Sequence, residues 1–280
     1  MENILIISPA YNVSNKIEKV LWSLNKYKKY CIFINDGSTD NTSQLIEKSG
    51  FPIINMPFNT GVSKSILTGL RYALKNGYKY VILIDADGQH NANDIEMIAN
   101  KLINSDAVFT NRFTKFHNIP SCKITANAFA SAIYKEISNY YIPDVSCGYK
   151  AFKVTPEIID YLSYTEGYSL IYKLVNYCII HKYDVSYIST QAIYYFEELL
   201  STRAEELIAL LSTAIQLSNI YIKDKTFKLL NELLQKTNSR QNFSATFCNI
   251  NFYAFYLKQY DSYILQAPLD KIAYFYNQGE

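Results

Sequence analysis

Two carboxylates one residue apart are the first feature of this sequence that could do chemistry. Asp85 and Asp87 follow directly on residues 81–84, an apolar and mostly β-branched run typical of a buried parallel strand. Carboxylates at the end of such a strand need a partner, and in an extended chain these two would point to the same side. With Gln89 they offer the hard oxygen ligands that suit Mg²⁺ or Mn²⁺. The alternative is a polar loop whose aspartates only cap the next helix, and this short motif does not decide between the two.

The elements that must position these residues follow a regular alternation. Strands are expected over residues 3–8, 31–34, 52–56 and 80–84, and helices over residues 17–24, 64–75 and 95–102. Strand and helix alternating at this spacing predict a doubly wound α/β fold with a mainly parallel sheet. Ligands bind such sheets beyond the carboxyl ends of the strands. The polar strand ends at residues 9–12, 35–38 and 85–90 should therefore line one crevice.

Composition limits the class of protein. The 280 residues are 49% hydrophobic, and a net charge of +2 argues against a nucleic-acid partner. The five cysteines form no C-x-x-C pair, which fits a reducing cytoplasm. The start does not resemble a signal peptide, and no apolar run reaches the ~18–20 residues of a membrane span. Residues 207–222 are uncharged and are expected to form a buried helix, with peripheral contact to a membrane surface left open.

Four ordered motifs carry a family resemblance. They are residues 8–12 (SPAYN), 35–42 (NDGSTDNT), 59–64 (NTGVSK) and 85–90 (DADGQH). In order and spacing they resemble the family 2 glycosyltransferases, and most closely the dolichyl- and polyprenyl-phosphate sugar transferases. The resemblance covers roughly the first two-thirds of the chain. It implies a GT-A fold, a UDP- or GDP-sugar donor, a divalent cation and inversion at the anomeric carbon.

The resemblance also implies a donor site, residue by residue. The implied nucleotide-binding residues are Pro9, Ala10, Tyr11, Asn35, Asp36, Gly61, Lys64, Asp85 and Ala86. The implied metal ligands are Asp85, Asp87 and Gln89. Asn35 stands where many members carry a second aspartate, which makes the choice of nucleotide less predictable. His90 is expected to be exposed to solvent rather than packed behind a metal ligand.

The acceptor side is less well defined. By resemblance, Arg112, Asp144 and Glu166 are the candidate catalytic residues, and Arg112 could bind a phosphate as a bidentate cation. Lys123 and Arg203 are candidates for a loop that contacts the diphosphate or the acceptor. A glycan hydroxyl would need a general base, supplied by Glu166 or Asp144, whereas a lipid phosphate is already anionic and needs none. Both acceptors, a polyprenyl phosphate and a glycan, stay open.

The expected organisation is one GT-A domain over residues 1–222, with a nucleotide-sugar half (1–102) and an acceptor half (103–222). Residues 223–280 are expected to be a helical extension without a recognisable motif. Two alternatives remain. The Asp-x-Asp motif also occurs in phosphatases of the haloacid dehalogenase type, although there it follows the first strand. A non-catalytic nucleotide-sugar-binding scaffold is the second, because Asn35 replaces an aspartate and residues 170–174 lack carboxylates.

Overall fold

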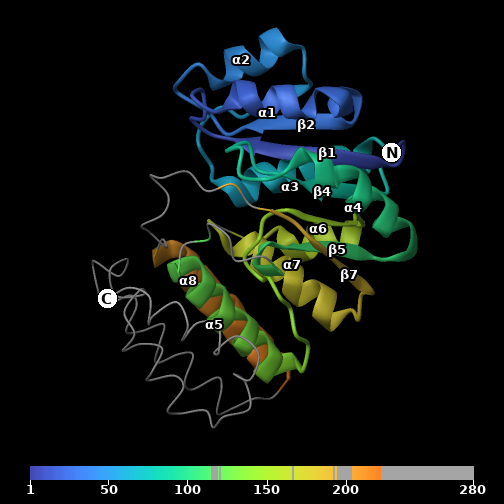
Figure 1. Ribbon diagram of the computed structural model, residues 1–280, viewed down its shortest axis with the longest axis vertical. Coiled ribbons are helices and arrows are strands. Elements are labelled where there is room, and N and C mark those ends of the chain that lie inside the picture. Colours follow the sequence, from blue (N-terminus) through green and yellow to red (C-terminus); the bar gives the residue numbers. More distant parts are fainter. Residues whose placement is uncertain (115–118, 120, 166, 192, 194–203, 222–280) are drawn as a thin grey trace.

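The computed structural model describes residues 1–114, 119, 121–165, 167–191, 193 and 204–221, with only the backbone for 121–126, 204–208 and 219 (Figure 1). Within these residues the centre of the fold is a seven-stranded sheet in the order β3-β2-β1-β4-β6-β5-β7. The strands are β1 Ile4–Ala10, β2 Cys31–Asn35, β3 Ile53–Asn55, β4 Tyr80–Leu83, β5 Ala107–Asn111, β6 Lys150–Lys153 and β7 Val185–Ser189. Only β6 runs antiparallel to its neighbours in this sheet, so the expected mainly parallel arrangement is confirmed.

Helices cover both faces of the sheet (Figure 1). One face carries α1 Ile17–Leu24, α2 Thr42–Ser49 and α4 Ile95–Lys101. The other carries α3 Val62–Lys75, α6 Pro156–Leu162 and α7 Ser169–Ile180, with α5 Ser121–Ser138 and α8 Ala204–Ile220 packed side by side beyond α7. Short 3₁₀ turns occupy Asn25–Tyr30, Ala92–Asp94, Leu102–Asn104 and Arg112–Thr114. Within the described part of the chain, no helix is both long and apolar enough to cross a membrane.

Residue periodicity explains these layers. In β1, Ile4 and Ile6 pack into the core below α1, whereas Leu5 and Ile7 pack into the core below α3, as the alternation of side chains along a strand requires. The buried residues of α1 recur at helical spacing on the face that meets the sheet. Gly77, in the left-handed region at φ 77°, follows the end of α3, where a glycine commonly ends a helix.

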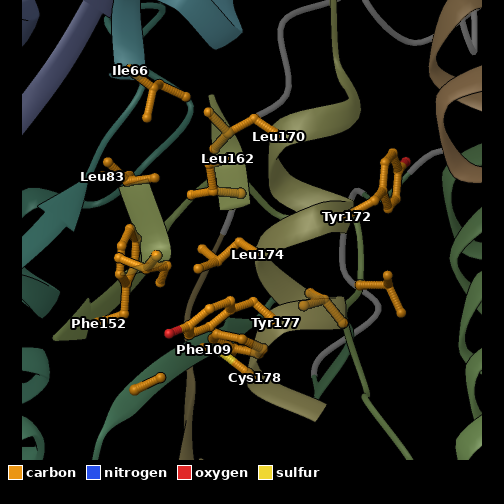
Figure 2. Close-up of a cluster of buried hydrophobic side chains, with 14 of the residues drawn as sticks. Ile66, Leu83, Phe109, Phe152, Leu162, Leu170, Tyr172, Leu174, Tyr177 and Cys178 are labelled. Atoms are coloured by element: carbon orange, nitrogen blue, oxygen red, sulfur yellow. The ribbon is translucent and has the colours of Figure 1, made fainter. Parts of the chain in front are cut away.

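The larger of the two cores joins elements from the whole described chain. Figure 2 shows side chains from α3, β4, β5, β6, α6 and α7 pointing into one cluster: Ile66, Leu83, Phe109, Phe152, Leu162, Leu170, Leu174 and Cys178. All of these side chains are buried. The cluster fixes the strands whose ends carry the candidate site.

The two expected halves of the domain share one sheet. Strand β6 comes from residues after 102, yet it lies between β4 of the first half and β5 of the second. Residues 1–102 therefore do not form a separate body, and the sheet is continuous across the expected boundary. The helix expected over residues 207–222 corresponds to α8, with shifted ends. The expected extension at 223–280 lies outside the described residues.

Candidate active site

Three parallel strands end at the same edge of the sheet. Strand β1 pairs in parallel with β2 and β4, so the loops after these strands emerge together. Hydrogen bonds join the first two loops: the amide of Asn12 donates to Ser38 Oγ at 3.0 Å, and the amide of Thr39 donates to Asn12 Oδ1 at 2.8 Å. The expected convergence of the polar strand ends is therefore confirmed, while the roles of their side chains remain proposals.

The acidic motif lies in a turn, not in an extended strand. Strand β4 ends at Leu83, before either aspartate, so the premise that the two carboxylates align by strand alternation is wrong. Gly88, at φ 80°, reverses the chain, and the amide of Gln89 donates to Asp87 Oδ1 at 2.9 Å. The turn brings the motif together because glycine tolerates this backbone conformation.

Asp85, Asp87 and Gln89 could hold a divalent cation through oxygen atoms. The side chain of Asp85 is 40% exposed, so a ligand can reach it. In the described part of the chain, no three His, Cys, Asp or Glu side chains are grouped to enclose a metal ion. A cation at this turn would therefore need further oxygen ligands from a bound molecule, and phosphate oxygens are the usual source for Mg²⁺.

His90 is buried, which contradicts the expectation that it would be exposed. Its side chain is 5% exposed, and its ring stacks on Tyr149 with centroids 4.9 Å apart and an interplanar angle of 15°. Nδ1 accepts a hydrogen bond from the amide of Asp85 at 3.2 Å, and Nε2 lies 3.6 Å from Asp85 Oδ2. No local pattern could have revealed the stacking contact, because Tyr149 is far away along the chain.

The charge of His90 depends on its neighbours. Burial lowers the pKa of His90, but the Asp85 carboxylate, Cys147 and Asp87 outweigh burial and raise it to about 9. A divalent cation between Asp85 and Asp87 would offset much of the negative charge that favours a second proton on the His90 ring. The neutral ring, whose Nδ1 can accept the Asp85 amide, is therefore the form expected beside a bound cation.

Asp36 ties the end of β2 to the start of α3. Its Oδ1 accepts hydrogen bonds from the amide and hydroxyl of Thr60 at 2.8 and 2.9 Å, and its Oδ2 accepts one from the amide of Gly61 at 2.8 Å. The residue is 3% exposed. Any nucleotide base that binds this carboxylate must share it with the loop before α3.

Asn35 has partners that suit an amide better than a carboxylate. Its Nδ2 donates to Asn55 Oδ1 at 2.9 Å, while its Oδ1 accepts from the amide of Ser38 at 3.2 Å. An aspartate at this position would place a carboxylate oxygen against Asn55 Oδ1. It would also lack the side-chain N–H group that donates the hydrogen bond to that oxygen. The amide of Asn35 thus fits the hydrogen bonds that it makes within the protein.

The remaining donor-side candidates differ in accessibility. Tyr11 is 43% exposed, Pro9 is half-buried, and Ala10 and Ala86 are buried. Lys64 Nζ donates to the carbonyl of Ser163 at 3.4 Å, so its side chain turns toward the loop after α6.

Arg112 and Asp144 form a bidentate ion pair. Arg112 Nε lies 2.7 Å from Asp144 Oδ2, and Nη2 donates to Oδ1 at 2.9 Å. The backbone amide of Arg112 donates to the same carboxylate at 3.1 Å, and Nη2 also reaches Ser146 Oγ at 3.0 Å. Because the Asp144 side chain is 0% exposed and both oxygens are held, its contacts argue against a general-base role.

Lys150 lies behind this pair and was not singled out from the sequence. It is 0% exposed, its Nζ donates to the carbonyl of Asp144 at 3.2 Å, and Nζ lies 4.6 Å from the ring centroid of Phe109. Burial lowers the pKa of Lys150. Lys150 thus secures the turn that carries Asp144.

Three candidates cannot be placed in the site. Glu166 and Arg203 lie outside the described residues, and for Lys123 only the backbone, within α5, is described.

Comparisons with known proteins point in one direction. A family model described as Glycosyl transferase family 2 matches residues 5–157. An uncharacterized protein of Methanocaldococcus jannaschii is 34% identical over 219 residues, which are 68% of this chain and 93% of that protein. A UDP-N-acetylglucosamine–dolichyl-phosphate N-acetylglucosaminyltransferase of Methanococcus voltae is 29% identical over 172 residues, 53% of this chain and 68% of that protein.

Solved structures share the fold. Glucosyl-3-phosphoglycerate synthase from Mycobacterium tuberculosis in complex with uridine diphosphate superposes with a TM-score of 0.59 at 18% identity, covering 76% of this chain and 80% of that one. The same enzyme with Mn²⁺, uridine diphosphate and glucosyl-3-phosphoglycerate superposes with a TM-score of 0.58 at 17% identity. This likeness confirms the expected GT-A fold. The phosphatase and scaffold alternatives find no support among these matches.

Proposed function

This chain belongs to glycosyl transferase family 2 and is a glycosyltransferase, and on that premise we propose that it moves a sugar from a nucleotide-sugar donor to a polyprenyl-phosphate acceptor, with a divalent cation and with inversion at the anomeric carbon. The relative from Methanococcus voltae is named for a UDP-sugar donor and a dolichyl-phosphate acceptor, which supports a donor and an acceptor of these classes. The proposed enzyme is the domain over residues 1–222, with residues 223–280 as an extension.

The donor side rests on the turn after β4. Asp85 and Asp87, with Gln89, would hold Mg²⁺ or Mn²⁺ at the edge of the sheet where the loops after β1 and β2 meet. Bound there, the cation would act as a Lewis acid on the charge that develops on the departing nucleoside diphosphate. Neighbouring residues 9–11 and Asp36 would seat the nucleoside.

The observation that carries the choice of acceptor is the Arg112–Asp144 pair. Its geometry leaves Asp144 occupied, so a hydroxyl acceptor would need its proton removed by another group. A phosphate acceptor is already anionic and needs no base. Because a polyprenyl phosphate lies in a membrane, we also propose that the protein contacts the cytoplasmic membrane face peripherally.

The test is transfer with defined substrates. The full chain is incubated with UDP- and GDP-sugars, with Mn²⁺, Mg²⁺ or chelator, and with a polyprenyl phosphate or an oligosaccharide; released nucleoside diphosphate is measured. We expect metal-dependent transfer to the polyprenyl phosphate from one class of donor. Asp87→Ala should reduce kcat/KM at least about 100-fold, because the cation loses a charged ligand.

Glu96→Gln is the matched control, since it removes an exposed carboxylate of α4 on the donor half. Its kcat/KM should equal that of the unchanged protein. Transfer that persists in chelator contradicts the proposed need for a divalent cation. Transfer to oligosaccharides alone contradicts the proposed polyprenyl-phosphate acceptor. Retention of the anomeric configuration, read from the coupling constant of the product sugar, contradicts inversion.

A further inference from the structure

The donor-side turn and the acceptor-side turn are in direct contact. The donor-side turn is residues 85–90, and the acceptor-side turn is residues 144–149. The ring of His90 stacks on that of Tyr149, and a Cβ on Gly148 would lie 2.9 Å from Asp85 Oδ2. The proposed chemistry uses Asp85 but gives these contacts no role.

We propose that His90 is a positioning residue that holds the Asp85 carboxylate in the orientation needed for the cation and links it to the acceptor-side turn. This inference rests on the proposed function, in which Asp85 is a metal ligand. His90 touches neither the sugar nor the cation and acts through Asp85.

The two nitrogens of His90 face two parts of Asp85. Nδ1 accepts the Asp85 amide at 3.2 Å, so in the neutral ring the proton is on Nε2, which faces Asp85 Oδ2 at 3.6 Å. One imidazole therefore hydrogen-bonds the backbone of Asp85 and lies against its carboxylate. Partners of this kind, placed behind a metal ligand, typically change metal affinity by 10- to 100-fold.

Gly148 restrains the same carboxylate from the acceptor side. With a possible Cβ only 2.9 Å from Oδ2, the backbone of the acceptor-side turn lies against Asp85, and a side chain there would displace one or the other. The Asp85 side chain is 40% exposed, so the rest of its surface faces solvent.

The acceptor-side turn is itself held in place at both ends. Arg112 bonds Asp144 and Ser146 at its start, and Tyr149 Oη donates to the carbonyl of Asn91 at 3.2 Å at its end. The turn thus links the Arg112–Asp144 ion pair to the Asp85 carboxylate, which is the proposed metal ligand. Asp85 is held by His90 on the donor side and by Gly148 on the acceptor side.

The experiment measures Mn²⁺ binding in the presence of UDP or GDP, by the electron paramagnetic resonance signal of free Mn²⁺. His90→Phe keeps a ring to stack on Tyr149 but removes both nitrogens, and it should weaken Mn²⁺ binding by about 10- to 100-fold. His90→Asn, whose amide oxygen can accept the Asp85 amide, should recover part of this loss. Gly148→Ala should weaken Mn²⁺ binding as well.

The matched control is His181→Phe. His181 also stacks on a tyrosine, Tyr177, with centroids 4.1 Å apart, but it follows α7 at the opposite edge of the sheet, beside the start of β7. This variant should bind Mn²⁺ like the unchanged protein. Thermal melting without metal checks that every variant is folded.

A metal-free measurement gives a second readout. The ¹⁵N shifts of the His90 ring in the apoprotein at a pH where the ring is neutral should show a proton on Nε2 and none on Nδ1. A proton on Nδ1, or a folded His90→Phe that binds Mn²⁺ as tightly as the unchanged protein, overturns the inference. If the unchanged protein binds no Mn²⁺ with either nucleotide, the proposed function fails first, and the inference that rests on it falls for that separate reason.

Discussion

Arg112 and Asp144 show how burial changes what an ion pair contributes to stability. The Asp144 side chain is fully buried and that of Arg112 is 12% exposed, so water screens the pair little. By contrast, Lys26 and Glu96 approach within 3.0 Å, but their side chains are 52% and 66% exposed. The two pairs have similar distances and should differ strongly in what their loss costs.

Asp144→Asn should lower the free energy of unfolding by about 3 kcal/mol, because the buried guanidinium of Arg112 loses its counter-charge. Equilibrium unfolding in urea measures this change. Glu96→Gln is the exposed counterpart and should leave the free energy of unfolding nearly unchanged. Equal costs for the two variants would show that the Arg112 pair is not the buried structural unit described above.

At the scale of elements, α3 lies unusually close to β1. A Cβ on Gly69 in the middle of α3 would lie 2.5 Å from Ile7 Cγ2, closer than two carbon atoms can approach. The missing side chain lets the helix approach the strand that precedes the nucleotide-side loop. Helix propensity and packing therefore predict opposite effects of Gly69→Ala on stability.

Gly69→Ala should be destabilising by about 1–3 kcal/mol, since overpacking against Ile7 outweighs the gain of about 1 kcal/mol that alanine has over glycine in a helix. A lower melting temperature is the expected result. Lys75→Ala changes an exposed residue of the same helix and should leave the melting temperature nearly unchanged. A higher melting temperature for Gly69→Ala would mean that α3 can move away from the sheet without cost.

At the scale of the whole molecule, the loops at the carboxyl edge hold the first two strands and α2 together. Asp40 accepts hydrogen bonds from the amide of Ser14, after β1, at 3.0 Å and from the amide of Thr42, at the start of α2, at 2.9 Å. Burial alone would raise the pKa of Asp40, but these hydrogen bonds lower it from 3.8 to about 2. The folded molecule thus favours the ionised form of this group.

A carboxyl whose pKa is lower in the folded state adds stability above its unfolded pKa, and that stability is lost as pH falls through the folded value. Asp40 should therefore contribute about 1–2 kcal/mol at neutral pH, with the contribution disappearing between about pH 4 and pH 2. Asp40→Asn should be less stable than the unchanged protein at pH 7, with the gap closing toward pH 2. Urea unfolding at several pH values measures the gap.

Asp160→Asn, at an exposed position of α6, serves as the control and should shift stability at pH 7 by less than about 0.5 kcal/mol. A gap for Asp40→Asn that stays constant with pH would assign its effect to lost packing rather than to charge.

Much of the fold was predictable because its signals are local. The alternation of apolar runs and amphipathic segments located the four strands of the first half and helices α3 and α4 within a few residues, and α1 at Ile17–Leu24. The antiparallel insertion of β6 between β4 and β5 was not predictable in this way, because strand order depends on which faces pack together rather than on any one segment.

The sequence by itself determined the α/β fold, the carboxyl edge where polar strand ends meet, and the Asp85–Asp87 motif, because each depends on residues close together in the chain. Only the tertiary structure decided that Asp144 is occupied by Arg112, that Asn35 pairs with Asn55, and that Lys150 is buried. It also decided that His90 lies inside, between Asp85 and Tyr149. The physical reason is that burial and pairing are set by distant segments brought together by one continuous sheet, and no local pattern encodes which partner a polar side chain will meet.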